Sequence, residues 1–115
     1  MTGNAQSGAA LIWSPFGSAE DARACAAVLL REKLIACANI VPAIESIFHY
    51  EGQLQSETEV GVLFKTHPSL LDAATARLAD LHPYYTPAIC GWMADSAPPE
   101  TCEWLAGLVQ GDAAR

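Results

Sequence analysis

Cys37 is the residue of this 115-residue chain with the most distinctive chemistry. Its thiolate is a soft ligand that would take Cu(I) or a similar thiophilic ion in preference to Mg²⁺ or Ca²⁺. The alternative is a small, buried side chain at a junction between a helix and a strand, and this structural role is favoured. No HxH, CxxC or HxxxH spacing supplies a second ligand nearby. A metal site at Cys37 would therefore need His82, or residues of another subunit, brought in by the fold.

His82 precedes a proline in the segment His82-Pro83-Tyr84, which is predicted to be a loop. An exposed imidazole there could bind a metal ion or act on a substrate, or it could cap backbone carbonyl groups at the end of a helix. The capping role is favoured. Cys37 and His82 are thus the predicted ligands for copper or another divalent cation, with a structural alternative for each.

Seven other residues are predicted to line a ligand cleft or a subunit interface: Asn39, Phe48, Tyr50, Glu59, Lys65, Tyr84 and Trp104. Glu59 and Lys65 lie six residues apart on one side of a predicted strand, so an ion pair of either would have to cross to another strand or subunit. Large aromatic side chains are typical of a core or an interface.

The sequence carries no recognisable enzyme motif. It contains no GxSxG, P-loop or GxGxxG pattern, and no nucleophile has a recognisable base close to it in sequence. Catalysis assembled across subunits has no positive support. We therefore expect a binding protein and not an enzyme, with no organic cofactor.

The charge balance excludes several kinds of partner. The chain has 13 acidic and 6 basic residues, a formal net charge of -7 and no basic run, so we expect neither a nucleic acid nor an anionic membrane as a partner. Hydrophobic residues make up 51% of the chain and charged residues 17%, which indicates that some apolar surface is buried between subunits.

The cysteines and the N-terminus indicate a cytoplasmic protein. The four cysteines form no CxxC pair and lie in predicted helices or strands, which fits reduced thiols better than disulfides or a structural zinc site. The first residues have no basic region before an apolar stretch, and no apolar run approaches the length needed to cross a bilayer.

The first half of the chain predicts a strand, a helix and a longer strand. Residues 1–8 are predicted to be a flexible tail, and 9–115 a single domain. A short buried strand at 9–13 should stop at Ser14-Pro15. Ser18 with Asp21 looks like a capping box, and the apolar spacing after it predicts a helix over about 19–33. The next strand, from 36 to 51, contains Pro42 and must be at an edge or bulged there.

The second half predicts a strand, a helix, a strand and a final helix. Residues 59–66 alternate as a strand that is joined to the previous one by the long connection EGQLQSET. Thr66-His67-Pro68 should open a helix that ends at His82-Pro83. Residues 88–93 form a last buried strand, and Pro98-Pro99 opens the final helix.

This order of elements predicts an α+β protein with a ferredoxin-like fold. The arrangement is β-α-β-β-α-β, an antiparallel sheet with two helices on one face, followed by an extra C-terminal helix. The other sheet face is then open. Ile47, Leu63 and Trp92 are predicted to lie on this open face and to need another subunit against them.

Several segments resemble the CutA family of divalent-cation tolerance proteins. The segment EKLIACANI at 32–40 is similar to the family signature, and SIFHYEG at 46–52 looks like its aromatic hairpin. Glu59 with Lys65-Thr66, and His82-Pro83-Tyr84 with Pro87, follow in the family's order. Phe48 and Tyr50 depart from the pattern, because tyrosine and tryptophan are usual at these two positions.

The resemblance implies a homotrimer with long hairpins around its three-fold axis and a role in tolerance of copper and other divalent cations. Two alternatives stay open. One is a trimeric small-molecule sensor that resembles PII-type signalling proteins, although the absence of a Gly-rich or basic phosphate cradle argues against a nucleotide ligand. The other is a purely structural scaffolding trimer.

Overall fold

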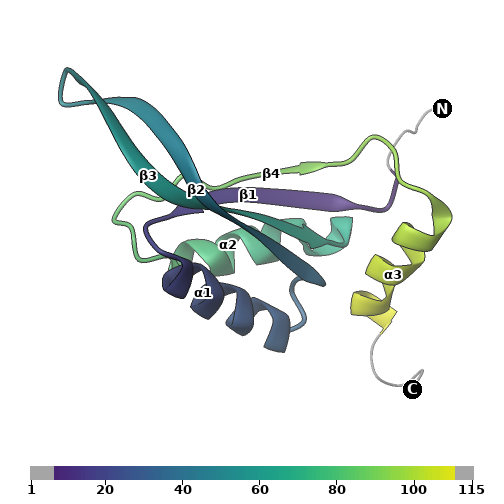
Figure 1. The fold of residues 1–115 in the computed structure, drawn as a ribbon. Helices are drawn as coiled ribbons and strands as arrows, with labels where there is room; N and C mark the ends of the chain where they lie inside the picture. The colour runs from purple at the N-terminus through teal and green to yellow at the C-terminus, as the bar shows by residue number, and fades with distance from the viewer. Residues whose placement is uncertain (1–6, 111–115) are drawn as a thin grey trace.

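A computed structural model describes residues 7–110 of the chain and shows one sheet with three α-helices (Figure 1). Its elements, in chain order, are β1 (Ala10–Phe16), α1 (Ala19–Arg31), β2 (Cys37–Tyr50), β3 (Gln53–Thr66), the short 3-10 helix η1 (Pro68–Leu70), α2 (Leu71–Leu81), β4 (Cys90–Met93) and α3 (Pro99–Gln110). The predicted α+β order, with its additional C-terminal helix, is confirmed.

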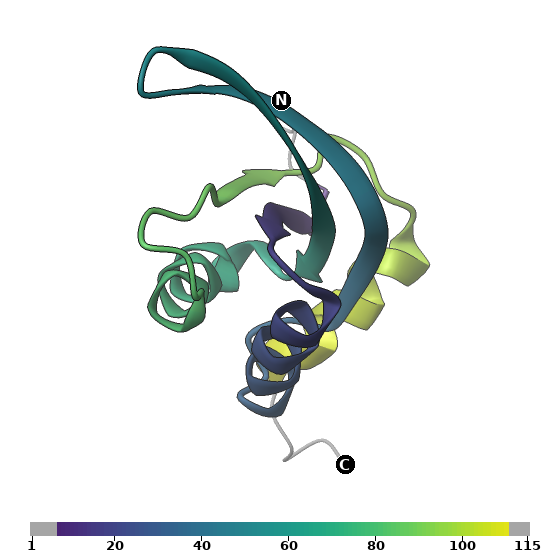
Figure 2. The ribbon, with the colours of Figure 1, turned by 60° about the vertical axis from the view of Figure 1, so that its left-hand side comes forward.

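The four strands form one antiparallel sheet in the order β2-β3-β1-β4. Helices α1 and α2 lie side by side on one face of the sheet, and α3 lies apart from them near the end where β3 finishes (Figures 1 and 2). This is the ferredoxin-like arrangement. The sheet face away from α1 and α2 is called the open face below.

The core lies between the sheet and the two helices, because alternate strand residues point to the same side. Ile12 and Phe16 of β1 and Phe64 of β3 are fully buried there, together with Leu29 of α1 and Leu78 of α2. Their neighbours along the strands point to the open face. This alternation fixes which strand residues can reach a partner or a ligand.

Helix α1 begins as its sequence predicts and ends slightly earlier. The Ser18 hydroxyl accepts a hydrogen bond from the Asp21 backbone N–H at 3.1 Å, which confirms the cap. The helix ends at Arg31 because Lys33 has a left-handed φ of 60°. Helix α2 follows η1, whose cap is His67 through its Nδ1, which accepts from the Ser69 N–H.

Strand β1 does not stop at Ser14-Pro15 as predicted but continues to Phe16. Pro15 pairs with Gly61 of β3, whereas β4 pairs with β1 only as far as Trp13. Pro15 therefore has a strand neighbour on one side only. Because β4 does not reach it, the missing N–H of the proline costs no hydrogen bond between β1 and β4. The predicted residues 88 and 89 likewise precede the first residue of β4, Cys90.

The connection between β2 and β3 is shorter than the sequence analysis predicted. Glu51 and Gly52 alone form the turn, with φ values of 51° and 79°, and β3 begins at Gln53. Two consecutive positive φ values are typical of a type I′ turn, whose twist matches that of a β-hairpin. Residues 53–58, predicted as a loop, are therefore strand, and the long hairpin projects beyond the rest of the sheet (Figure 1).

A bulge at Pro42-Ala43 changes which residues of β2 face each side. The pairing steps from Val41 with Gly61 to Ile44 with Glu59, so β2 carries one residue more than β3 there. Ala43 has a φ of 60°, and β2 is an edge strand, as the proline required.

Three residues were predicted to lie on the open face, and the bulge decides the face of one of them, Ile47. Leu63 and Trp92 pair with open-face residues of β1, so they lie on the open face as expected. Ile47 was predicted to join them, and this is wrong: it pairs with Ser56, which lies on the side of the sheet that carries the helices.

Most of the predicted N-terminal tail lies outside the described residues, so that prediction stays untested. Of the tail residues that are described, Ser7 donates a hydrogen bond from its hydroxyl to the Ala94 carbonyl.

Candidate ligand pocket and the Cys37 region

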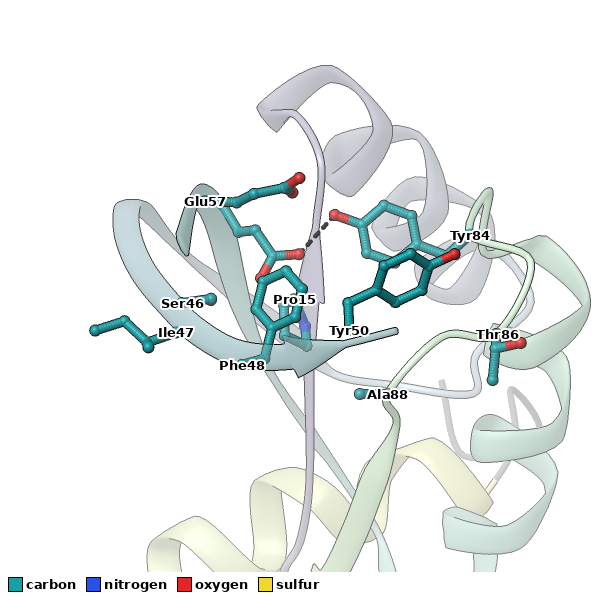
Figure 3. Close-up of a pocket in the computed structure, with 10 residues that line it drawn as sticks. Pro15, Ser46, Ile47, Phe48, Tyr50, Glu57, Tyr84, Thr86 and Ala88 are labelled. Atoms are coloured by element: carbon teal, nitrogen blue, oxygen red, sulfur yellow. Dashed lines mark hydrogen bonds between the residues drawn. The ribbon is translucent and has the colours of Figure 1, made fainter. Parts of the chain in front are cut away.

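Four of the predicted cleft residues come together under the hairpin. Phe48 and Tyr50 of β2, Glu59 of β3 and Tyr84 of the segment before β4 line a pocket of about 560 Å³, here called the hairpin pocket (Figure 3). The odd-numbered residues of β3 and, after the bulge, the even-numbered residues of β2 point to the open face. The pocket is therefore an extension of the open face, closed at one end by the Tyr84 segment.

A short hydrogen bond ties the hairpin to the segment before β4. The Tyr84 hydroxyl donates to Glu59 Oε2 at 2.6 Å (Figure 3). Burial raises the pKa of the Tyr84 hydroxyl, and the neighbouring Glu59 carboxylate raises it further, because a second negative charge is unfavourable there. Tyr84 thus remains a neutral donor at neutral pH, and its hydroxyl fixes the position of the Glu59 side chain.

His82 has a structural position behind this pair. The residue is 6% exposed, and its ring stacks on Phe16 with ring centres 4.2 Å apart. Nδ1 accepts from the Tyr84 backbone N–H at 3.2 Å, so Nε2 carries the proton and donates to the Pro15 carbonyl at 2.9 Å. Burial lowers the pKa of His82, against the opposing effects of the Pro15 carbonyl, Asp21 and Glu59.

This geometry does not suit the predicted role of His82 as a metal ligand. A metal ion needs a free imidazole lone pair, and the Nδ1 lone pair is used by the Tyr84 N–H. The predicted capping role is closer to the structure, although the ring binds a carbonyl of β1 and an amide of its own loop, not the end of α2. His82 positions Tyr84.

Cys37 lies far from His82 and on the other face of the sheet. Cys37 pairs with Lys65, which pairs with Leu11, whereas His82 binds the carbonyl of Pro15. Four residues along a strand span about 13 Å. The two predicted ligands therefore do not meet within one chain.

The surroundings of Cys37 are polar and partly open. Its thiol is half-buried and donates to the Asn39 side-chain oxygen at 3.6 Å, on the open face. Among residues 7–110, no three His, Cys, Asp or Glu side chains gather closely enough to hold a metal ion. One chain thus offers Cys37 and Asn39 there, a soft sulfur beside an amide oxygen.

Lys65 and Trp104 belong to a different pocket from Glu59. They line a hollow of about 340 Å³ between β1, β3 and α3, together with Leu11 and Thr101. The sequence analysis grouped Lys65 with Glu59 because both lie on one side of β3. The structure separates them along the strand, and the hydrogen-bond partner of Glu59 is Tyr84.

The sequence analysis missed three polar residues of the hairpin pocket, Ser46, Glu57 and Thr86. Glu57 lies two residues from Glu59 on β3 and shares its face, so the strand period would have identified it if 53–58 had been recognised as strand. Thr86 lies in the irregular segment before β4, where no periodicity assigns a side.

The fold and the hairpin pocket define a ferredoxin-like α+β protein with a ligand-sized hollow on its open sheet face. No helix within residues 7–110 has the length and apolar character needed to span a membrane. The CutA1 divalent ion tolerance protein family model matches residues 10–107. The chain belongs to this family.

Individual relatives agree with this assignment. The divalent-cation tolerance protein CutA of Pyrococcus horikoshii is 33% identical over 95 residues, which cover 83% of this chain and 92% of that protein. The crystal structure of the divalent ion tolerance protein CutA1 from Ehrlichia chaffeensis superimposes with a TM-score of 0.84 at 32% identity, and covers 89% of this chain and 95% of that one.

Plant relatives are longer than the matched region. The chloroplastic protein CutA 1 of Oryza sativa is 37% identical over 86 residues, which cover 75% of this chain and 49% of that protein. The chain therefore spans about half of this relative's length.

Proposed function

We propose that the chain acts in tolerance of divalent cations, copper in particular, as a homotrimer that binds metal and does not turn over a substrate. The proposal rests on the family and on one observation. The half-buried Cys37 thiol lies on the open face, next to the Asn39 side-chain oxygen. Thiolates favour Cu(I) over hard cations.

The homotrimer and the metal site support each other physically. Residues 7–110 of one chain supply too few ligands at Cys37 for a stable site, because thiophilic ions bind through two to four soft or nitrogen ligands. The open face also carries Leu63, Trp92 and Val41, with Trp92 and Val41 exposed in a single chain. Neighbouring copies on this face would cover the apolar residues and complete the coordination. A cytoplasmic location is part of the same proposal, because reduced thiols are needed.

The test is a Cu(I) titration of the reduced protein against a chromogenic competitor. We expect the wild type to take up Cu(I) and Cys37→Ser to lose that uptake, because the variant has no soft ligand at this position. Cys90→Ser is the matched control, because Cys90 is an exposed free thiol at another place in the fold. Equal uptake by Cys37→Ser and the wild type, or no uptake by the wild type, would exclude direct binding at Cys37.

The hairpin pocket favours a second candidate, a trimeric sensor of a small molecule. Its volume of about 560 Å³ is within the range of ligand sites. A purely structural trimer would make no use of it. A thermal-shift screen of metabolites tests this candidate, since a ligand of the folded state raises the unfolding temperature. A screen without any shift argues for the structural trimer.

A further inference from the structure

We propose that protonation of His82 releases Tyr84 from the hairpin and thereby weakens the homotrimer in mildly acidic solution. The inference rests on the homotrimer of the proposed function and adds a regulation that the fold itself supplies. Its basis is a series of hydrogen bonds that runs from Pro15 of β1 through His82 and Tyr84 to Glu59 of β3, here called the Tyr84 bridge.

Both ring nitrogens of neutral His82 are part of this bridge. Nε2 donates to the Pro15 carbonyl at 2.9 Å, and Nδ1 accepts from the Tyr84 backbone N–H at 3.2 Å. A second proton on the ring must go to Nδ1, because Nε2 already carries one. Nδ1 would then be a donor that faces the N–H of Tyr84, which is also a donor. Protonation therefore breaks this hydrogen bond and replaces it with repulsion.

The surroundings of the ring favour its neutral form. The ring lies between those of Phe16 and Tyr84, with ring centres 4.2 Å and 4.9 Å away. The charged groups around it are Asp21 of α1 and Glu59 of β3, and both favour the protonated form. Burial outweighs them and lowers the pKa of His82. A protonated ring is therefore more stable once the segment after α2 has moved it toward water.

The segment that His82 holds in place is also a wall of the hairpin pocket. The Tyr84 hydroxyl donates to Glu59 at 2.6 Å, and Glu57 lines the same pocket. None of the described residues that line it is Lys, Arg or His. Without Tyr84, the Glu59 carboxylate would lose this donor beside a second carboxylate, and no cation would compensate either charge.

The hairpin pocket belongs to the open face, so its lining lies at the interface of the proposed homotrimer. Phe48 and Tyr50 face Tyr84 across the pocket (Figure 3). A displaced aromatic ring and a buried carboxylate without its donor are both costly between packed copies. Neutral His82 is thus a positioning residue that keeps this surface in the shape that assembles.

The sign of the pH dependence follows from these two states. In the released chain His82 has the ordinary histidine pKa of about 6.5, and in the bridged chain its pKa is lower. The contribution of the Tyr84 bridge to assembly is therefore complete above about pH 6.5 and is lost as the pH falls through the lower pKa of the bridged chain.

Analytical ultracentrifugation of the full-length protein, over a dilution series at several pH values, tests the proposal. We expect the concentration at which half of the trimer dissociates to rise at least about tenfold between about pH 7.5 and pH 5, because one unit of pKa difference is worth tenfold per chain. Circular dichroism at each pH should show that the dissociated chains remain folded.

The outcomes separate the switch from the homotrimer. A homotrimer whose dissociation does not depend on pH would overturn the switch and leave the proposed function standing. A wild-type monomer at neutral pH would overturn both. Unfolded chains in the acidic samples would assign the loss of the trimer to acid denaturation, and this result would also overturn the switch.

A variant of each end of the Tyr84 bridge identifies the groups responsible. His82→Gln keeps a side-chain donor for the Pro15 carbonyl but cannot titrate, so its dissociation should no longer depend on pH. Tyr84→Phe keeps the ring and removes the hydroxyl that binds Glu59. It should weaken the trimer at neutral pH and also reduce the pH dependence, because the connection from His82 to the hairpin is then broken.

The other two histidines of the chain provide matched controls. His49→Gln and His67→Gln should each keep the pH dependence of the wild type, because neither residue is part of the Tyr84 bridge. A pH dependence that persists in His82→Gln would assign it to other groups and exclude the switch. If His82→Gln does not fold, Tyr84→Phe decides alone, and an unchanged pH dependence in that variant would exclude the switch.

Discussion

At the scale of single residues, Gly61 on the open face allows the Trp13 side chain to pack directly against the backbone of β3. A Cβ on Gly61 would overlap Cη2 of the Trp13 indole and lie 2.8 Å from its Cζ2 and 3.2 Å from Ile44 Cδ1. Neither the rigid ring nor the strand can give way cheaply.

Two glycine substitutions should therefore act in opposite directions. We expect Gly61→Ala to reduce the free energy of unfolding by about 1–3 kcal/mol, the usual cost of overpacking. Gly107→Ala in α3 should increase it by about 0.5–1 kcal/mol, because no atom beyond the adjacent residues and the nearby backbone of α3 lies within 4 Å of the new methyl group and alanine favours a helix. Urea unfolding at one fixed protein concentration measures both. A Gly61→Ala protein as stable as Gly107→Ala would contradict the packing described here.

At the scale of elements, His82 couples the end of α2 to the pocket wall, and this coupling should depend on pH. The folded state lowers the pKa of His82, mainly by burial, so the unfolded state takes up the proton more readily. The stabilisation by neutral His82 is complete above the ordinary histidine pKa of about 6.5. It is lost as the pH falls from there through the lower pKa of the folded state.

We therefore expect the unfolding temperature of the wild type to fall as the pH is lowered below about 6.5, before most carboxylates titrate. The hydrogen bond to the Pro15 carbonyl and the charges of Asp21 and Glu59 oppose this lowering of the pKa without reversing it. His82→Gln should be less stable at neutral pH and should lack this part of the slope. His49→Gln, which changes an exposed histidine on β2, should retain it. A slope that survives in His82→Gln would assign the pH dependence to other groups.

At the scale of the whole molecule, the projecting hairpin is the feature that supports the proposed homotrimer. The two strands of the hairpin extend beyond both helices that cover the sheet (Figure 2). Ile47 and Leu54 lie on one face of it and are 65% and 72% exposed in the single chain. Exposed apolar side chains on a long edge hairpin are unusual for a monomer and typical of an interface.

Light scattering on a sizing column should accordingly give three times the chain mass of 12.2 kDa. The substitution Ile47→Lys or Leu54→Lys should shift the mass toward that of the monomer, because the introduced charge would be buried between copies. Thr58→Lys is the control, since Thr58 is an exposed polar residue on the same face of the hairpin. A wild-type monomer at micromolar concentration would contradict the homotrimer.

The sequence by itself determined the family and the order of the elements. It also identified four of the residues that line the hairpin pocket. The segment 32–40 and the later motifs carry the family resemblance, and the periodic apolar residues after Ser18 and after Pro68 predict α1 and α2. Phe48, Tyr50, Glu59 and Tyr84 were identified as cleft residues. Such signals are local, because caps, turns and residue periods act over a few positions.

Only the tertiary structure decided which of these residues meet. The bulge at Pro42-Ala43 exchanged the faces of β2, which a count of alternate residues cannot detect without a known strand partner. It therefore placed Phe48 on the same side as Glu59 of β3, and Ile47 on the other side. His82 became a neutral support for Tyr84, and Cys37 lies on the opposite face from it. Both outcomes depend on the register between strands far apart in sequence, and packing of the complete sheet sets that register.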